Sequence, residues 1–420
     1  MLDLEDSERE LKSGAGDPSK APDRSPPVQP TVTSLEFKLA DLELRLGKDH
    51  DEVGLLLDDL ADAYQSHGRY TDAGRALTRA LAIFEKSSGA GHPDVANLLN
   101  QMASLRSAQG EHAEAERLAR RAVEITESVL GLRAVAGRAD LDEETAAAVE
   151  AIRRRGLRGI GDCARAQGRL GDAESFLLQA LELTRRALPR DDPEIASSAC
   201  ALGVLYKYWG KFERAESCYR EARTILEPRS AEDPVSYSAV LYNLAGLAHA
   251  RGQHVQAEPL CREALSIKER VLGDDHYDTV ISRMTLGAIL EGREQLAAAL
   301  ELYERSRADL ERLFGPDHPD VAVCLNNLGT TRRALGQPAA AEQDFKRAIA
   351  IREKTLGTEH PALGTPLLNL GELYAATGRS AEAERCYRRA LAVLEPGWGP
   401  EHPITRRVRA HLERLLEGGR

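Results

Sequence analysis

The chain has 420 residues, of which 29% are charged and only 5% aromatic. Ala, Leu, Glu and Arg are abundant, and because these residues favour helices, the composition predicts an all-α protein. A formal charge of −11 argues against a general nucleic-acid-binding surface. No apolar run reaches the roughly 18 residues that span a bilayer, and the acidic start does not resemble a secretory signal, so we expect a cytoplasmic protein without membrane insertion.

The two ends of the chain are expected to differ from the middle. Residues 1–33 are predicted to be a disordered tail, acidic at first and then rich in Pro, Ser and Gly. Residues 34–53 should form a capping helix and a loop, because leucines recur at helical spacing from Leu35 to Leu46. At the other end, residues 404–420 are predicted to be a second capping helix with a charged outer face.

Residues 54–403 contain eight copies of one repeat. The copies share a glycine that recurs every 42 residues, apart from one interval of 58 residues and one copy in which Glu replaces the glycine. These positions are Gly68, Gly110, Gly168, Gly210, Gly252, Glu294, Gly336 and Gly378. An alanine stands five residues after each of them, and the seventh residue before each is Gly or Ala. This regularity indicates a structural repeat.

Each repeat is interpreted as a helical hairpin whose first helix ends at the glycine, because glycine adopts the left-handed conformation without a steric penalty. The small residues allow the two helices to approach closely. One hairpin cannot bury its own apolar face, so the eight should stack into a right-handed α-solenoid. The long interval predicts a 16-residue insertion near residues 131–146, part of which should lengthen the helix that follows.

The loops between repeats carry a proline that suits the first position of a helix. These prolines are Pro93, Pro193, Pro319, Pro361 and Pro403. His92, His318, His360 and His402 precede four of them, and we interpret these histidines as loop and capping residues. A metal site would need the histidines to converge, whereas successive repeats hold them apart, and the six cysteines show no close pairing. We therefore predict no metal and no cofactor, and reduced structural cysteines.

The repeat resembles the tetratricopeptide repeat. That pattern begins with a large apolar residue followed by a small one and continues with the turn glycine. An alanine, an aromatic residue or Leu, and a second small residue follow the glycine. The 42-residue period and the segments 315–322 (GPDHPDVA) and 356–361 (LGTEHP) are similar to the repeats of kinesin light chains and their bacterial relatives. The resemblance covers roughly residues 35–416. It implies a solenoid in which the first helix of each pair lines a concave groove.

The resemblance also implies where candidate binding residues lie. Nine residues before the turn position, three repeats carry an Asn, whose amide could bond to the backbone of an extended peptide. Three residues before it, the middle repeats are basic, and the third repeat adds two arginines, which would attract an acidic peptide. The candidate peptide-binding residues are Arg155, Arg158, Arg165, Lys207, Asn243, His249, Asn326, Asn327, Arg333 and Asn369. Alternatively, the amides bond to neighbouring helices, and the bases form a solvated face with Asp162 as an internal partner.

These features favour a non-catalytic scaffold that binds an extended, acidic segment of a partner protein in the concave groove. One alternative is a regulatory sensor whose groove holds a small peptide or the chain's own N-terminal tail. An enzyme with a pocket between helices is a remote third alternative, because the sequence has no phosphate-binding loop, HExxH motif or nucleophile elbow. No catalytic residue is predicted, and the oligomeric state is left open.

Overall fold

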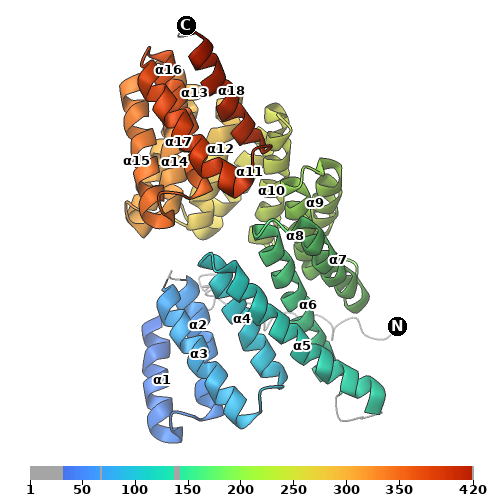
Figure 1. Cartoon of the computed structure of the whole chain (residues 1–420). Coiled ribbons are helices and arrows are strands. Elements are labelled where there is room, and N and C mark those ends of the chain that lie inside the picture. Colours follow the sequence, from blue (N-terminus) through green and yellow to red (C-terminus); the bar gives the residue numbers. More distant parts are fainter. Residues whose placement is uncertain (1–31, 67–68, 137–141, 419–420) are drawn as a thin grey trace, which may run out of the picture. The chain divides into compact units, whose positions relative to one another are not determined.

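The structure is a computed structural model that describes residues 32–66, 69–136 and 142–418. These residues form eighteen α-helices and two short 3-10 helices, and no strand (Figure 1). The predicted all-α fold of stacked hairpins is confirmed. The predicted tail lies outside the described residues, except for Val32 and Thr33, which already belong to the first helix. The chain divides into two compact units, Met1–Ala139 and Asp140–Arg420, which we describe separately as unit 1 and unit 2.

Unit 1 consists of a single helix followed by two hairpins. The single helix is α1 (Val32–Leu46). The hairpins are α2 (Asp51–Ser66) with α3 (Tyr70–Ser87), and α4 (Pro93–Ala108) with α5 (His112–Ala136).

Unit 2 consists of six hairpins and a final helix. The first helices are α6 (Glu143–Ala166), α8 (Pro193–Tyr208), α10 (Pro234–Ala250), α12 (Tyr277–Gly292), α14 (Pro319–Ala334) and α16 (Gly364–Ala376). Their second helices are α7 (Leu170–Ala187), α9 (Phe212–Leu226), α11 (His254–Leu272), α13 (Leu296–Phe314), α15 (Pro338–Leu356) and α17 (Ser380–Trp398). The 3-10 helices are η1 (Glu227–Arg229) and η2 (Pro361–Leu363), and the final helix is α18 (Pro403–Gly418).

Helices that follow one another in sequence pack against one another in both units. In unit 2, each first helix also contacts the first helix of the next hairpin, from α6 through α8, α10, α12 and α14 to α16. The first helices therefore form one continuous layer, and residues at equivalent positions of successive repeats become neighbours across it. No helix in the described part of the chain is both long enough and apolar enough to cross a membrane.

The alanines that follow the turn positions form the closest-packed part of each hairpin. All eight are fully buried, with no exposed surface: Ala73, Ala115, Ala173, Ala215, Ala257, Ala299, Ala341 and Ala383. A larger side chain at these positions would overlap the facing helix, because protein interiors are packed as densely as organic crystals. The invariant alanine of the sequence pattern therefore has a steric cause.

The turn positions adopt the left-handed conformation that the sequence predicts. The six turn glycines that the structure describes have φ between 72° and 80°. Glu294, which replaces glycine in the sixth hairpin, has φ of 61° and is the single non-glycine residue with positive φ in the described ranges. The chain path at this turn is therefore set by the repeat and not by the residue that occupies it.

The histidines of the inter-repeat loops cap the helices that follow them. In each case, Nδ1 accepts a hydrogen bond of 3.2 to 3.4 Å from the backbone N–H two residues later. The residues are His92, His276, His318, His360 and His402. Asp192 and Asp233 cap α8 and α10 through their carboxylates, which accept from the backbone N–H groups of Glu194 and Ser236. Nowhere in the described ranges do three His, Cys, Asp or Glu side chains gather as a metal site would require.

The insertion lengthens two helices. α6 has 24 residues and begins after Asp142, whose carboxylate accepts a 2.6 Å hydrogen bond from the Thr145 backbone N–H. α5 has 25 residues and continues through Gly131, although other repeats end their second helix near this point. The sequence interpretation covered only the following helix, because it did not anticipate that Gly131 would be helical. Residues 137–141 of the predicted insertion lie outside the described residues.

Candidate functional site

A row of basic side chains crosses the layer of first helices in unit 2. Arg165, Lys207 and His249 stand three residues before the turn glycines of α6, α8 and α10. We call these three residues the basic row. Burial lowers the pKa of Lys207, and the positive charge of Arg165 lowers it further. The pKa of His249 is lowered by burial, by His254 and by Lys207. Arg165 thus acts on Lys207, and Lys207 acts on His249, along the row.

Lys207 is a cation of the row to which the described residues offer no acidic partner. Its side chain is half-buried, and within the described ranges no carboxylate lies within ion-pair distance of its ammonium. Gly246 on α10 lies beside it, since a Cβ atom added there would lie 3.3 Å from Lys207 Nζ. The missing side chain at Gly246 therefore leaves room next to a half-buried cation.

Two further arginines on α6 extend the basic surface. Arg158 donates a 3.0 Å hydrogen bond to Ser197 Oγ of α8, and Arg155 is exposed. The expected internal partner, Asp162, lies 3.7 Å from Arg165. Burial raises the pKa of Asp162 although Arg165 and Arg158 act to lower it. Asp162 is a single carboxylate beside two arginines, so it can offset only part of their positive charge.

Arg333 stands at the equivalent position of α14, but unlike Lys207 it pairs with an acidic side chain. Its Nη1 donates a 2.7 Å hydrogen bond to the Glu372 carboxylate of α16, which also pairs with Arg407 of α18. On α12, the position three residues before the turn is occupied by Glu291, whose pKa is raised by burial. Acidic side chains from neighbouring helices therefore neutralise this part of the layer, and a peptide contact at Arg333 stays a prediction.

The four candidate amides have different partners. Asn369 Nδ2 donates a 2.9 Å hydrogen bond to Asn326 Oδ1, which links α16 to α14. Asn243 is in hydrogen-bond contact with the Cys200 thiol, whose pKa is raised to about 12 by burial. The Asn327 side chain is half-buried and has no hydrogen-bond partner among the described residues. Of the four, Asn327 has the most free bonding capacity for a ligand.

Tyr208 is a candidate that the sequence reasoning missed. It stands two residues before the turn glycine of α8, next to Lys207, and 65% of its surface is exposed. The other repeats carry only small residues at this position: Ser66, Ala108, Ala166, Ala250, Gly292, Ala334 and Ala376. Exposed aromatic side chains are frequent anchors of binding surfaces. The signal was present in the aligned repeats, where Tyr208 is the one large residue of its series.

Comparisons with known proteins agree with the repeat pattern. The family model of the tetratricopeptide repeat matches residues 51–128, 153–227, 236–312, 283–354 and 332–395. Similar solved structures include BtubC (BKLC) from P. vanneervenii, at 26% identity over 58% of this chain and 92% of that one, with a TM-score of 0.46. The apo form of RapI is 13% identical over 72% of this chain and 98% of that one, with a TM-score of 0.51.

A putative kinesin light chain from Podosopora anserina with nearly identical TPR-like repeats is also similar. It is 24% identical over 49% of this chain and 96% of that one, with a TM-score of 0.43. A comparison with curated protein sequences finds no match.

Proposed function

Because the chain belongs to the tetratricopeptide repeat family, we propose that it is a non-catalytic scaffold that binds an extended acidic segment of a partner protein. The proposed binding surface is the layer of first helices in unit 2, with the basic row on α6, α8 and α10 and Asn327 on α14. Repeat proteins of this architecture use such extended surfaces for binding.

The unpaired ammonium of Lys207 carries the proposal. A half-buried cation without a counter-ion gains free energy when an anionic group arrives, because charges attract more strongly where water is partly excluded. Arg165 and His249 lie on either side of Lys207 in the row, and Gly246 leaves space beside it. A carboxylate side chain is the peptide group that fits this position.

Two neutral side chains would supply the remaining contacts of a peptide. Tyr208, the residue after Lys207 in the sequence, offers an exposed aromatic surface, and aromatic residues are frequent anchors of interfaces. Asn327 offers an amide with a donor and an acceptor, which can pair with the backbone of an extended peptide whatever its sequence. The basic row would therefore set the preference for acidic side chains, and the Asn327 amide would recognise the main chain of the peptide.

A binding titration tests this proposal. A fluorescently labelled Glu-rich peptide should bind the full chain, and Lys207→Glu should weaken binding at least about tenfold. Arg385→Glu is the matched control, because it reverses the charge of an exposed arginine on α17, a second helix. Equal losses in both variants, or no binding of acidic peptides by the parent chain, would contradict the proposal. If the peptide binds as expected, capture of partner proteins by the full chain followed by mass spectrometry would identify the natural ligand.

A further inference from the structure

A cluster of aromatic side chains lies between two hairpins of unit 2, where α12 and α14 begin and α13 ends. The Tyr277 and Phe314 rings meet edge to face, with centroids 5.6 Å apart and planes at 88°. The His318 ring stacks on Phe314 at a centroid distance of 4.6 Å. Tyr277 and Phe314 are nevertheless 41% and 39% exposed. Two rings at a right angle are therefore partly open to solvent.

Both of these rings depart from the repeat pattern. Tyr277 stands where the next repeat carries Pro319, and several other repeats also have proline at this position. Phe314 stands where the adjacent repeats carry Leu272 and Leu356. Since those repeats form the same hairpins, the fold does not need the two rings. Two departures that meet in one exposed contact indicate a role in binding.

Asp320 gives the cluster a negative charge. The Tyr277 hydroxyl donates a 2.9 Å hydrogen bond to Asp320 Oδ2. His318 Nδ1 lies 3.6 Å from the same oxygen, but it accepts a hydrogen bond from the Asp320 backbone N–H and so carries no proton there. Among the described residues, no Lys or Arg side chain lies within ion-pair distance of Asp320. The carboxylate therefore keeps its charge, and 27% of the side chain is exposed.

Basic side chains that reach the two loops of the cluster, residues 273–276 and 315–318, are engaged with other groups. Three of them pair with aspartates of these loops: Arg305 with Asp274, Arg312 with Asp275, and Lys354 with Asp317. Arg347 pairs with Glu311 at 2.7 Å and donates to the Pro316 carbonyl. A base that moved to Asp320 would leave one of these acids unpaired, so the chain has no spare cation for this site.

An arginine side chain fits this combination of rings and carboxylate. A guanidinium is planar, stacks on aromatic faces and is attracted to them as a cation. It also presents several N–H groups in a fixed fork that matches a carboxylate. Tyr277 bonds to Oδ2 of Asp320, which leaves Oδ1 available to accept from a guanidinium. A lysine ammonium would meet the charge but lacks the planar fork.

We propose that the cluster of Tyr277, Phe314 and Asp320 binds an arginine side chain of a partner protein. This surface is separate from the basic row, because Tyr277 and Asp320 stand at the beginnings of their first helices and the row stands near the ends. The two surfaces select opposite charges. Arginine binding here does not require that an acidic segment bind the basic row.

NMR spectroscopy of the full chain with isotope-labelled phenylalanine provides the test, since the sequence has only six phenylalanines. A short peptide with one arginine, otherwise uncharged and blocked at both ends, should shift the Phe314 signal in a saturable manner. Phe314→Leu identifies that signal. The same peptide with citrulline, which keeps the shape but lacks the charge, should cause no shift. The peptide with lysine should bind at least about threefold more weakly.

Two variants test the groups that would hold the guanidinium. Tyr277→Pro removes a ring and Asp320→Asn removes the charge, and each should weaken the arginine peptide at least about threefold. Tyr277→Pro introduces the residue that other repeats carry, so the helical circular dichroism should be unaltered. Asp94→Asn is the matched control, because Asp94 occupies the equivalent His-Pro-Asp segment of α4 in unit 1. It should bind the peptide like the parent chain.

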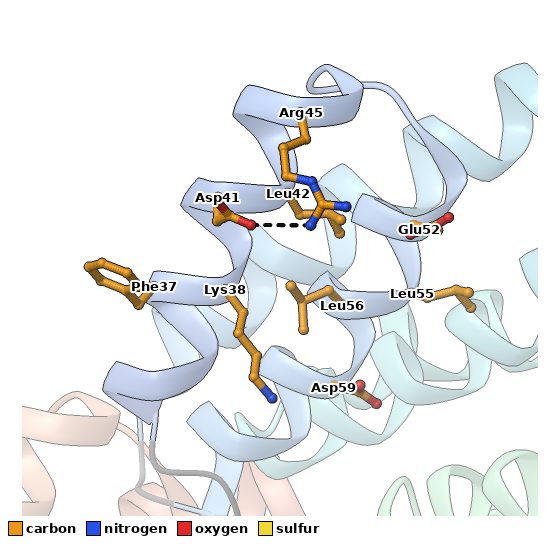
Figure 2. A pocket seen from close by; sticks show the side chains of 9 residues that line it. All are labelled: Phe37, Lys38, Asp41, Leu42, Arg45, Glu52, Leu55, Leu56 and Asp59. Carbon is orange, nitrogen blue, oxygen red and sulfur yellow. Dashed lines mark hydrogen bonds and ion pairs between the residues drawn. The ribbon is translucent and has the colours of Figure 1, made fainter.

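Phe37 of α1 is the matched control for the ring. Figure 2 shows it at one side of the groove between α1 and α2, pointing away from the other side chains drawn, and it is 80% exposed. Its signal should not respond to the peptide. Equal shifts at Phe37 and Phe314, or equal effects of the arginine and citrulline peptides, would overturn the proposal. The same holds for parent-like binding by Tyr277→Pro and Asp320→Asn, an equal loss in Asp94→Asn, or no Phe314 shift at millimolar peptide.

Discussion

A Cβ atom added to Gly203 would lie 2.5 Å from Cε1 of Tyr219, so the missing side chain of one residue makes room for the ring of the other. The same relationship joins a glycine of the first helix to an aromatic ring of the second in three more hairpins: Gly287 with Tyr303, Gly329 with Phe345, and Gly371 with Tyr387. Where the first helix has Ala instead, the corresponding residue of the second helix is smaller: Leu77, Ala119 and Cys261. In these seven hairpins the aromatic ring thus occurs only opposite glycine, and in the remaining one Gly161 faces Leu177.

This relationship predicts that Gly203→Ala destabilises the chain by roughly 1 to 3 kcal/mol, because the added methyl group overpacks the contact with Tyr219. Gly74→Ala is the control: its Cβ would lie 3.5 Å from Leu105 Cδ2, an ordinary contact, so this helix should gain stability. Urea unfolding of both variants measures the difference. Adding Tyr219→Leu to Gly203→Ala should recover part of the loss; if the two costs simply add, the residues are not coupled.

Replacing Glu294 by Gly should stabilise the sixth hairpin by roughly 1 kcal/mol, because a residue with a Cβ atom is strained at positive φ. Glu294→Ala keeps the Cβ atom and should bring no such gain. Thermal unfolding of the two variants distinguishes relief of backbone strain from loss of the charge. Equal shifts in both would assign the effect to the charge.

The basic row and the free amide should respond differently to salt. Reversal of Arg158 and Arg165 to Glu should weaken an acidic peptide strongly at low ionic strength and less at high ionic strength, because partly exposed charges are screened over about 10 Å at 0.1 M salt. Asn327→Ala should weaken binding by roughly 0.5 to 1.5 kcal/mol at either ionic strength, since it removes neutral hydrogen bonds. Titrations at two salt concentrations make the comparison. If both variants bind the peptide as tightly as the parent chain, the binding site does not lie on the layer of first helices.

Binding of an acidic peptide should strengthen when the pH falls from 7 toward 5. The pKa of His249 lies below its ordinary value of 6.5 because of burial, His254 and Lys207, so the ring is neutral at pH 7 and gains a proton only in more acidic solution. Protonation then adds a positive charge to the row, while most peptide carboxylates remain ionised down to about pH 5. The unliganded fold should lose stability over the same interval, since the unfolded chain binds that proton more readily.

His249→Ala should abolish the gain in affinity at low pH without altering affinity at pH 7 by a similar factor. Titrations of parent and variant at several pH values provide the measurement. A gain that persists in the variant would show that a group other than His249 is responsible.

The sequence predicted the hairpins of this protein because their determinants are local and repeated. A turn residue with positive φ, a histidine that caps the next helix and an alanine without room for a larger side chain each act over a few residues. Glu294 could also be assigned to the turn position, although it is not a glycine, because the surrounding repeat fixes the backbone. The insertion was harder to predict, because helix formers on both sides of Gly131 allowed either neighbouring helix to grow.

By itself, the sequence determined which residues can line the layer of first helices, because their positions follow from the 42-residue period and the helical turn. Only the tertiary structure decided which of them are free to bind. Glu372 lies 39 positions from Arg333 yet pairs with it, whereas Lys207, at an equivalent position, has no described carboxylate in reach. The reason is that a long side chain bonds to whatever the neighbouring repeats bring within a few ångströms, and that depends on helix packing and side-chain rotamers rather than on any local signal.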